Sequence, residues 1–346
     1  MLTALLEWYI DHGRALPWRT ERDPYRVWLR EIMLQQTTVA AVIPYFERFL
    51  ARFPTVDVLA AADEADVLRL WEGLGYYSRA RNLHRAAQRI MSDHDGEFPQ
   101  DVAALQSLPG IGRYTAGAIA SFAFEQPAAI VEANTLRLYC RLLGYADDPR
   151  STAGQRALWA FAESLITSPG SPGTINQALM DLGATVCTPT EPSCEQCPVS
   201  RWCAAFAAGQ QRDIPRPAKR IELTDVIEAT VAVRHRGRYL LRRRPHGERW
   251  AGLWDFPRYA VTNHEPLSRT LVEQIREQTG IDIALGEQLA EFKHGVTRYR
   301  ITLRCFHAER QSGRLRSDVE LQWASPDEFA ALALSMTGRK FARLLA

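Results

Sequence analysis

The sequence predicts a mostly helical region up to about residue 210, followed by a domain of mixed α and β structure. In stretches such as 71–91 and 113–124, apolar residues recur every three or four positions and are interrupted by glycine, a pattern typical of short packed helices. Later in the chain the pattern changes to short β-like runs with a single helix candidate among them. The runs are 226–234, 238–243 and 298–309, and the helix candidate is 266–280.

The segment 207–225 is the clearest linker, because it carries two prolines and mixed charge. We therefore expect a first domain at 1–210, a linker at 211–224 and a second domain at 225–346. No internal repeat is evident.

The composition is that of a soluble globular protein. The chain has 346 residues, of which 46% are hydrophobic and 24% charged. Residues 1–19 are too polar for a secretion signal and instead predict an amphipathic helix. No run approaches eighteen consecutive apolar residues, so we expect no membrane span and a cytoplasmic location.

Charge alone says little about partners, because the formal net charge is only +2. Two stretches, 79–89 and 234–249, are rich in arginine. Such clusters are usually solvated surface, but they also suit contact with nucleic acid.

The string LPGIGRYTAGAIA, residues 108–120, is a strong local signal. Gly110 and Gly112 allow a tight turn, and the next helix is predicted to begin around Arg113. The free amides at that helix start can hold a phosphate oxygen of DNA. An ordinary corner between two helices is the alternative.

Four of the six cysteines lie within seventeen residues. This clustering, in a chain without a secretion signal, favours a metal centre over disulfides. Zinc normally takes two close cysteine pairs separated by a longer loop, so a [4Fe–4S] cluster fits the spacing better. Buried cysteines without a ligand are the remaining alternative. The four residues are Cys187, Cys194, Cys197 and Cys203.

Two carboxylates stand in otherwise apolar stretches. Glu31 and Gln35 are four apart in 24–46, on one helical face, and Glu132 follows the apolar run 127–131. A desolvated carboxyl group can stay protonated near neutral pH and act as a general acid. An exposed stripe and an ordinary acid at a helix start are the simpler readings.

The chain resembles adenine DNA glycosylases of the MutY family along almost its whole length. The similar stretches are ALPWR, WLREIMLQQTTV, WEGLGYYSRARNL, LPGIGRYTAGAI, INQALMDLGATVC, the cysteine quartet and WAGLWDFP. The resemblance implies a two-lobed helix-hairpin-helix glycosylase domain with an iron–sulfur loop, followed by a Nudix-like domain. It also implies removal of adenine mispaired with 8-oxoguanine or guanine in double-stranded DNA by a monomeric enzyme.

The resemblance assigns roles to individual residues. Glu31 matches the acid that protonates adenine, and Glu132 stands where the family has an aspartate that stabilises the sugar cation. Asn134 matches a retained asparagine, and Tyr114 matches a tyrosine that supports the stabilising carboxylate. Contacts near the mismatch are implied for Gln36, Thr37, Leu74 and Tyr76.

Three further implications concern the reaction and its specificity. Related lyases carry a lysine in the hairpin where this chain has Tyr114, so we expect a glycosylase that does not cut the strand. The family reads 8-oxoguanine with a Phe-Ser-His loop, and this chain has Phe292, Lys293 and His294 there. The stretch 271–281 holds too few carboxylates for the Mg²⁺ chemistry of Nudix hydrolases.

Two other functions stay open from the sequence. One is a lesion- or mismatch-binding protein whose catalysis is weakened by glutamate in place of aspartate. The other is a glycosylase of the same fold with a shifted base preference, such as thymine or guanine mispairs.

Overall fold

The computed structural model describes residues 1–167, 170–216, 222–261 and 267–346. The chain divides into two compact units, which are Met1–Ala61 with Asn82–Lys219 and Ala62–Arg81 with Arg220–Ala346. The division near residue 219 falls inside the linker predicted at 211–224. The inclusion of Ala62–Arg81 in the second unit was not foreseen.

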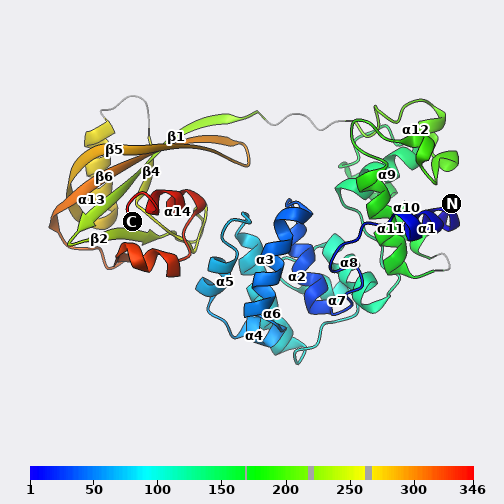
Figure 1. Ribbon diagram of the computed structural model, residues 1–346, viewed down its shortest axis with the longest axis horizontal. Helices are drawn as coiled ribbons and strands as arrows, with labels where there is room; N and C mark the ends of the chain where they lie inside the picture. The colour runs from blue at the N-terminus through cyan, green and yellow to red at the C-terminus, as the bar shows by residue number, and fades with distance from the viewer. Residues whose placement is uncertain (168–169, 217–221, 262–266) are drawn as a thin grey trace. The chain divides into compact units, whose positions relative to one another are not determined.

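The elements follow the predicted change from helices to strands (Figure 1). The helices are α1 (Leu2–His12), α2 (Pro24–Leu34), α3 (Val39–Arg52), α4 (Val56–Ala60), α5 (Glu64–Leu70), α6 (Ser78–Asp93), α7 (Val102–Ser107), α8 (Arg113–Phe124), α9 (Ala133–Leu143), α10 (Thr152–Ile166), α11 (Pro172–Thr185), α12 (Ala204–Ala207), α13 (Leu267–Thr279) and α14 (Met336–Ala342). The strands are β1 (Thr224–His235), β2 (Arg238–Arg243), β3 (Trp254–Asp255), β4 (Arg258–Ala260), β5 (Ile281–Val296), β6 (Tyr299–Gly313) and β7 (Leu321–Ala324). Short 3₁₀ turns lie at Cys194–Gln196, Ser200–Trp202 and Pro326–Ala331.

Local signals explain where the helices of the first unit begin. Asp23 caps α2 by accepting the amide of Tyr25, and Pro24 occupies the first turn, where a missing N–H costs nothing. Helices α9, α10 and α11 share one core with Leu5 of α1. Among the described residues, no strand precedes Thr224, which confirms the helical prediction for this region. No described helix has the length and hydropathy needed to cross a bilayer.

The hairpin between α7 and α8 is built as predicted, with one correction. Gly110 has a φ of 78°, and a Cβ there would lie only 2.7 Å from the Cβ of Asn82, so glycine is required. Gly112, in contrast, has an extended backbone and caps α8, which begins at Arg113 as predicted. A Cβ at Gly112 would meet nothing within 4 Å. The turn therefore does not require glycine at residue 112. The lack of a side chain there leaves open space before the first amides of α8.

The second unit is built on a sheet in which the order is β3-β2-β1-β6-β5, with β4 paired to β1 and β7 paired to β2. Strands β1 and β6 are parallel, and the other pairs are antiparallel. Helix α13 packs on one core through Leu271 and Ile275, and α14 contributes Phe341 to a second core. The predicted strands at 226–234, 238–243 and 298–309 lie in β1, β2 and β6, which confirms them.

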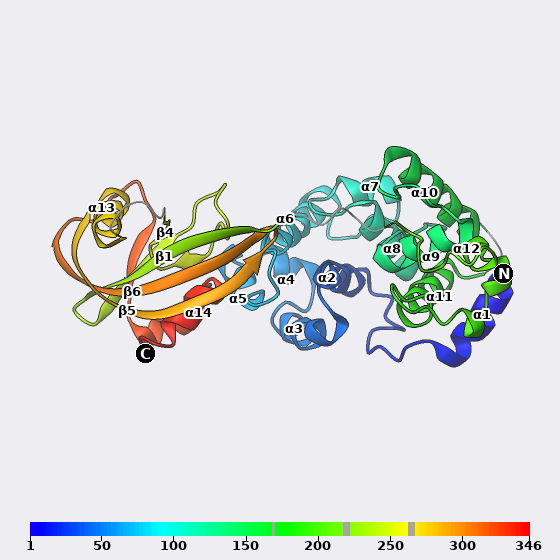
Figure 2. The ribbon, with the colours of Figure 1, turned by 90° about the horizontal axis from the view of Figure 1, so that it is seen from above.

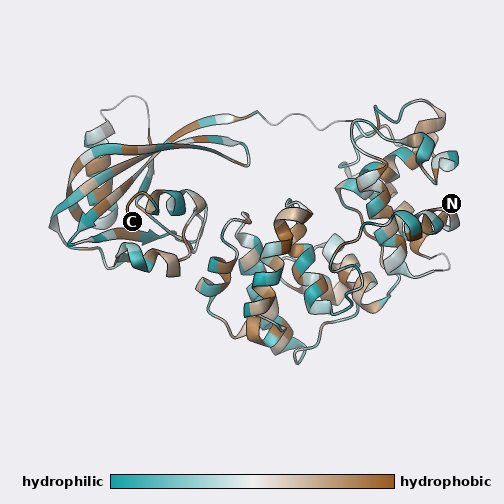
Figure 3. Ribbon diagram, viewed as in Figure 1, coloured by the Kyte–Doolittle hydropathy of each residue, from teal (hydrophilic) through white to brown (hydrophobic). Residues whose placement is uncertain are grey.

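Strand β5 was not predicted, although it is the longest strand described. It pairs with β6 as an extended hairpin (Figure 2). From Ala284 to Leu289 most of its residues are exposed, so the alternation of apolar and polar side chains that marks a half-buried strand is missing there. Polar and apolar stretches along this hairpin are visible in Figure 3.

Candidate active site

A cavity of about 440 Å³ opens in the first unit between α2, α8, the start of α9 and the segment before α2. Its volume is in the range of small-molecule sites and accommodates a purine base. Six of the residues assigned by resemblance line it together, although they come from three separate parts of the sequence. They are Glu31, Gln36, Thr37, Tyr114, Glu132 and Asn134.

Glu31 is buried on α2, with only 3% of its surface exposed. Its Oε2 accepts the hydroxyl of Tyr114 at 2.6 Å, and its Oε1 accepts Nε of Arg30 at 3.2 Å. Arg30 is held in turn by the carbonyl of Trp18 at 2.8 Å. These donors satisfy both oxygens of a carboxylate that has been removed from water.

The partner of Tyr114 differs from the expectation. The resemblance implied that Tyr114 supports the stabilising carboxylate, Glu132, whereas its hydroxyl bonds to Glu31. Burial, followed by the charge of Glu31, raises the pKa of Tyr114 well above its usual value of 10. Tyr114 therefore remains a neutral donor, and it positions the buried acid.

Glu132 is both a helix-start residue and a residue of the cavity. It is the N-cap of α9, where Oε2 accepts the amide of Asn134 and Oε1 the amide of Thr135, each at 2.9 Å. The Thr135 hydroxyl bonds back to the Glu132 amide at 2.9 Å, completing a capping box. The carboxylate is thus folded back on its own helix. A Cβ at Gly117 of α8 would lie 2.3 Å from the carbonyl of Ala129, so glycine there lets the segment before Glu132 pack closely.

Burial raises the pKa of Glu132 above its usual 4.5, while the amides of Asn134 and Thr135 oppose that rise. The charge of Glu31 raises this pKa further. If the reaction needs Glu132 as an anion, activity is lost as the pH falls through this raised pKa. We therefore expect the acidic limb of kcat/KM to lie above pH 4.5 and to disappear in Glu132→Gln. A pH series of initial rates on the free enzyme measures it; an unchanged limb in Glu132→Gln would assign it to another group.

Asn134 joins the cavity to the cysteine loop. Its Nδ2 donates to Oε2 of Glu132 at 3.3 Å, and its Oδ1 accepts Arg137 at 3.0 Å. Arg137 also donates to the carbonyls of Gly183 and Cys187, at 2.6 and 2.8 Å. A continuous hydrogen-bond chain therefore runs from the carboxylate of Glu132 to the backbone carbonyl of Cys187, the first cysteine of the quartet.

The four clustered cysteines line a single small cavity beside α9. Arg141 is 2% exposed, and its Nη1 donates both to Cys187 Sγ at 3.2 Å and to the carbonyl of Thr188 at 2.7 Å. Its Nη2 and Nε donate to the carbonyls of Pro189 and Ile214. Across the described residues, no group of three or more potential ligands is arranged to hold a single metal ion. Cys140 and Cys305 are also buried but do not line this cavity.

Several cavity residues were missed from the sequence. Arg14 and Arg19 both line the cavity and bond to the fully buried Asp181 of α11, with contacts of 2.6 to 2.9 Å. Gln177 also lines it and accepts the hydroxyl of Tyr9 at 2.9 Å. Arg19 lies in the stretch ALPWR, and Gln177 and Asp181 lie in INQALMDLG, but neither stretch by itself indicates these contacts.

The residues assigned to DNA contact differ in their exposure and in their contacts within the protein. Gln36 is exposed with a φ of 57°, and Thr37 is beside it at the cavity. Arg113 is paired with Glu163 at 2.5 Å and lies over the ring of Trp159. Leu74 is 7% exposed, so most of its side chain is packed, and its contact with DNA stays a prediction. Tyr76, in the second unit, is 50% exposed with a φ of 47°.

The Phe-Lys-His sequence lies within strand β5 and not in a loop. Phe292 pairs with Leu303 and packs on the core shared with α14. Lys293 is exposed on the opposite face, because neighbouring residues of a strand alternate. His294 lies on the same face as Phe292 and is half-buried. The three side chains therefore do not face one site.

The fold and the paired carboxylates define a base excision DNA glycosylase of the helix-hairpin-helix class with an added Nudix domain. Residues 29–164 match the family of HhH-GPD superfamily base excision DNA repair proteins, and residues 229–344 match the NUDIX domain family. A solved thermostable thymine-DNA glycosylase is similar, with 29% identity and a TM-score of 0.55 over 60% of this chain and 95% of that one.

The full-length relatives identify the family. An adenine DNA glycosylase from Mus musculus is 34% identical, covering 98% of this chain and 76% of that protein. One from Homo sapiens is also 34% identical, covering 99% of this chain and 73% of that protein. The chain belongs to the adenine DNA glycosylase family. It is an enzyme of base excision repair that hydrolyses N-glycosyl bonds in DNA.

Proposed function

We propose that this enzyme removes adenine paired with 8-oxoguanine, or with guanine, from double-stranded DNA, and that it leaves the strand uncut. The observation that supports the proposal is the pair of carboxyl groups, the buried Glu31 and the half-buried Glu132, at one cavity large enough for a purine. The adenine must first leave the base stack, at a cost of a few kcal/mol.

Glu31 is the proposed general acid. Adenine is a poor leaving group as an anion, so protonation of its N7 precedes or accompanies cleavage of the bond to the sugar C1′. The electron pair of that bond leaves with the base, and the sugar becomes an oxocarbenium-like cation. Water then adds to C1′ and gives up a proton, so the products are free adenine and an abasic site.

Glu132 is the proposed electrostatic stabiliser of the sugar cation. Both of its oxygens already accept backbone amides, which reduces their availability for a covalent bond to C1′. Its negative charge is still present at the cavity, and Asn134 fixes its orientation. A preorganised charge of this kind acts without reorganisation during the reaction.

A base-release experiment tests the proposal. Single-turnover adenine release is measured on duplexes that carry A opposite 8-oxoguanine, A opposite guanine and A opposite thymine. The proposal requires release from the first two, with little from the third. Release of thymine or guanine from their own mispairs, without adenine release, would replace it with the shifted base preference.

The absence of strand cutting is tested on the same duplexes. No lysine lies at residue 114, where the related lyases attack the sugar, so we propose that no Schiff base forms. Borohydride should trap no covalent enzyme–DNA adduct, and strand breaks should require alkali. A trapped adduct in the wild-type enzyme would overturn the monofunctional assignment.

Cys187, Cys194, Cys197 and Cys203 are the proposed ligands of a [4Fe–4S] cluster. Their position around one cavity supports a shared centre, and their spacing, which lacks two close pairs separated by a longer loop, favours a cluster over one zinc ion. When bound, the cluster would tie together the loop after α11, which lies beside α9. Arg141 and Arg137 connect this loop to the helix that begins at Glu132.

We expect purified protein to contain iron and acid-labile sulfide in equal amounts, and Cys197→Ser to lose most of both. Loss of the cluster should lower the unfolding temperature of the first unit, because the loop would no longer be tied together. Cys140→Ser is the matched control, since Cys140 lies outside the cavity of the quartet. Stoichiometric zinc without sulfide would contradict the assignment.

The Nudix-like domain is proposed to recognise DNA without hydrolysing nucleotides. On α13, Glu273 is exposed and paired with Arg269. Gln274 and Gln278 occupy positions at which Mg²⁺ binding by a Nudix hydrolase would require further acidic residues. Their Oε1 atoms are buried without a hydrogen-bond partner. Neutral amides at these positions cannot replace the carboxylates that hold Mg²⁺ against a pyrophosphate.

A further inference from the structure

His294 lines a cavity of about 490 Å³ in the second unit. Trp250, Arg249 and Lys340 line the same cavity, and the Trp250 ring centre is 6.2 Å from that of His294. Tyr76 also belongs to this lining. The cavity therefore combines aromatic surfaces with cationic side chains, a composition that suits nucleic acid.

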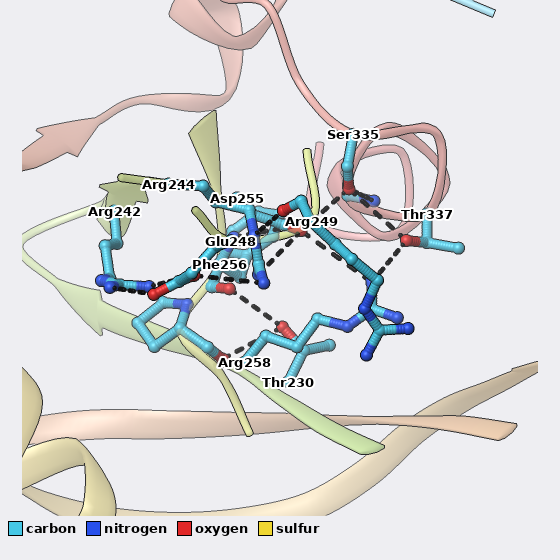
Figure 4. Close-up of polar contacts among 12 residues, drawn as sticks. Thr230, Arg242, Arg244, Glu248, Arg249, Asp255, Phe256, Arg258, Ser335 and Thr337 are labelled. Carbon is cyan, nitrogen blue, oxygen red and sulfur yellow. Dashed lines mark hydrogen bonds and ion pairs between the residues drawn. The ribbon is translucent and has the colours of Figure 1, made fainter. Parts of the chain in front are cut away.

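Arg258 is held in one orientation beside His294. Its Nε donates to Oε2 of Glu228, its Nη1 donates to Oγ1 of Thr337 at 2.9 Å, and its Nη2 lies 3.3 Å from Nε2 of His294. Both Arg258 and Glu228 are buried. Figure 4 shows Arg258 among the polar side chains that include Asp255, Ser335 and Thr337. Because guanidinium nitrogens are fixed in one plane, these contacts also fix the direction of Nη2.

This contact determines the proton position on His294. A guanidinium has only donors, so Nε2 of His294 must be the acceptor and cannot carry a proton. Burial, followed by the charge of Arg258, lowers the pKa of His294 to about 4. Arg249 and Lys340 lower it further and Glu228 opposes them, so the ring is neutral at pH 7. A neutral ring without a proton on Nε2 carries its proton on Nδ1.

The Nδ1 atom of His294 is buried and has no hydrogen-bond partner. A buried donor without an acceptor is costly, and most such groups in proteins are satisfied. An oxygen acceptor in the neighbouring cavity would satisfy this N–H after a small rotation of the ring. The cationic side chains of Arg249 and Lys340 favour an acceptor that is anionic or strongly polar.

We propose that Arg258 and Glu228 are positioning residues that hold His294 as the neutral Nδ1–H tautomer, which donates to an oxygen of the lesion-bearing strand. The acceptor is a phosphate oxygen or a carbonyl oxygen of the oxidised purine. This inference rests on the proposed recognition of the lesion by the second unit. It adds a defined donor atom and the two residues that specify it.

The tautomer is measured first, in the free full-length protein, with ¹⁵N-labelled histidine and long-range ¹H–¹⁵N correlation spectra. His294→Asn identifies the signal among the eight histidines. The expected result is a protonated Nδ1 and a bare Nε2 at pH 7, with a shift toward the Nε2–H form in Arg258→Gln. Arg300→Gln, an exposed arginine paired with Asp225, is the control and should leave the tautomer unchanged. An Nε2–H tautomer in the wild-type protein would overturn the proposal.

Binding is measured next, with a duplex whose adenosine carries a 2′-fluorine to prevent cleavage. Asparagine places an amide donor near Nδ1 of histidine, whereas glutamine places it near Nε2. We expect His294→Asn to bind A opposite 8-oxoguanine about tenfold more tightly than His294→Gln. Equal affinities of the two variants would reject Nδ1 as the donor.

Two duplex changes identify the acceptor. The first change places a methylphosphonate in the lesion-bearing strand. If it abolishes the difference in affinity between His294→Asn and His294→Gln, the acceptor is a phosphate oxygen. The second change replaces 8-oxoguanine by guanine, and if this abolishes the difference in affinity, the acceptor is the lesion carbonyl. Persistence of the difference in both cases would reject an acceptor on that strand. Adenine release is recorded separately, so failure of the proposed function is distinguishable from failure of the tautomer, which is measured without DNA.

Discussion

Glu31→Gln is expected to slow adenine release by about 1000-fold, the loss typical of a removed general acid. A glutamine keeps an oxygen that accepts the Tyr114 hydroxyl, but it cannot deliver a proton to adenine N7. Its amide N–H groups also face Arg30, which has only donors, so one hydrogen bond near the cavity is lost. Single-turnover release with saturating enzyme measures the chemical step without interference from product release.

The matched control for Glu31→Gln is Glu21→Gln, which makes the same change at a partly exposed carboxylate paired with Arg26. This control should release adenine at the wild-type rate. DNA affinity should change little in either variant, since neither carboxylate is proposed to hold the duplex. Near-wild-type release by Glu31→Gln would remove it from the mechanism and leave Glu132 as the sole catalytic carboxyl group.

Glu132→Gln is expected to slow release by about 100-fold, because the stabilising charge is lost while an oxygen remains to accept one amide of α9. Glu132→Ala should be equally slow and also about 1 kcal/mol less stable to unfolding, since it removes the N-cap as well. Glu132→Asp keeps both the charge and the cap and should lose the least activity. Release rates and denaturant unfolding of the same preparations separate the two effects.

A second N-cap provides the control for Glu132. Asp101 caps α7 by accepting the amide of Ala104 at 2.9 Å, away from the cavity. Asp101→Ala should cost a similar free energy of unfolding without slowing adenine release. If Glu132→Gln released adenine as fast as wild type, Glu132 would be a helix cap without a catalytic role.

The sequence predicted those elements whose local pattern and tertiary surroundings agree. Helix α8 spans 113–124 and strand β2 spans 238–243, both as their apolar patterns indicated. Strand β5 was not predicted, because much of it is exposed and it lacks a regular apolar pattern. Its extended conformation depends on pairing with β6. Pairing across a hairpin is invisible in the residues of one strand.

The residues named from the sequence include part of the cavity lining, but neither its arginines nor all of its contacts were predicted. Glu31, Tyr114 and Glu132 line one cavity, yet which carboxylate receives the Tyr114 hydroxyl depends on how α8 packs against α2. The buried position of Leu74 likewise depends on packing that no short motif encodes. The roles themselves came from resemblance, since a single acid in an apolar run does not reveal its chemistry.

Because Glu132 belongs to a capping box, a substitution there can abolish repair activity and yet leave the stability of the protein almost unchanged. Replacing that carboxylate by its amide preserves most of the helix start, so the variant should fold, express and melt much like the parent. Surveys that rank variants of this enzyme by abundance or thermal stability would therefore score Glu132→Gln as harmless. Cells that carry it would accumulate unrepaired mispairs, and a mutation-rate assay would detect what the stability assay misses.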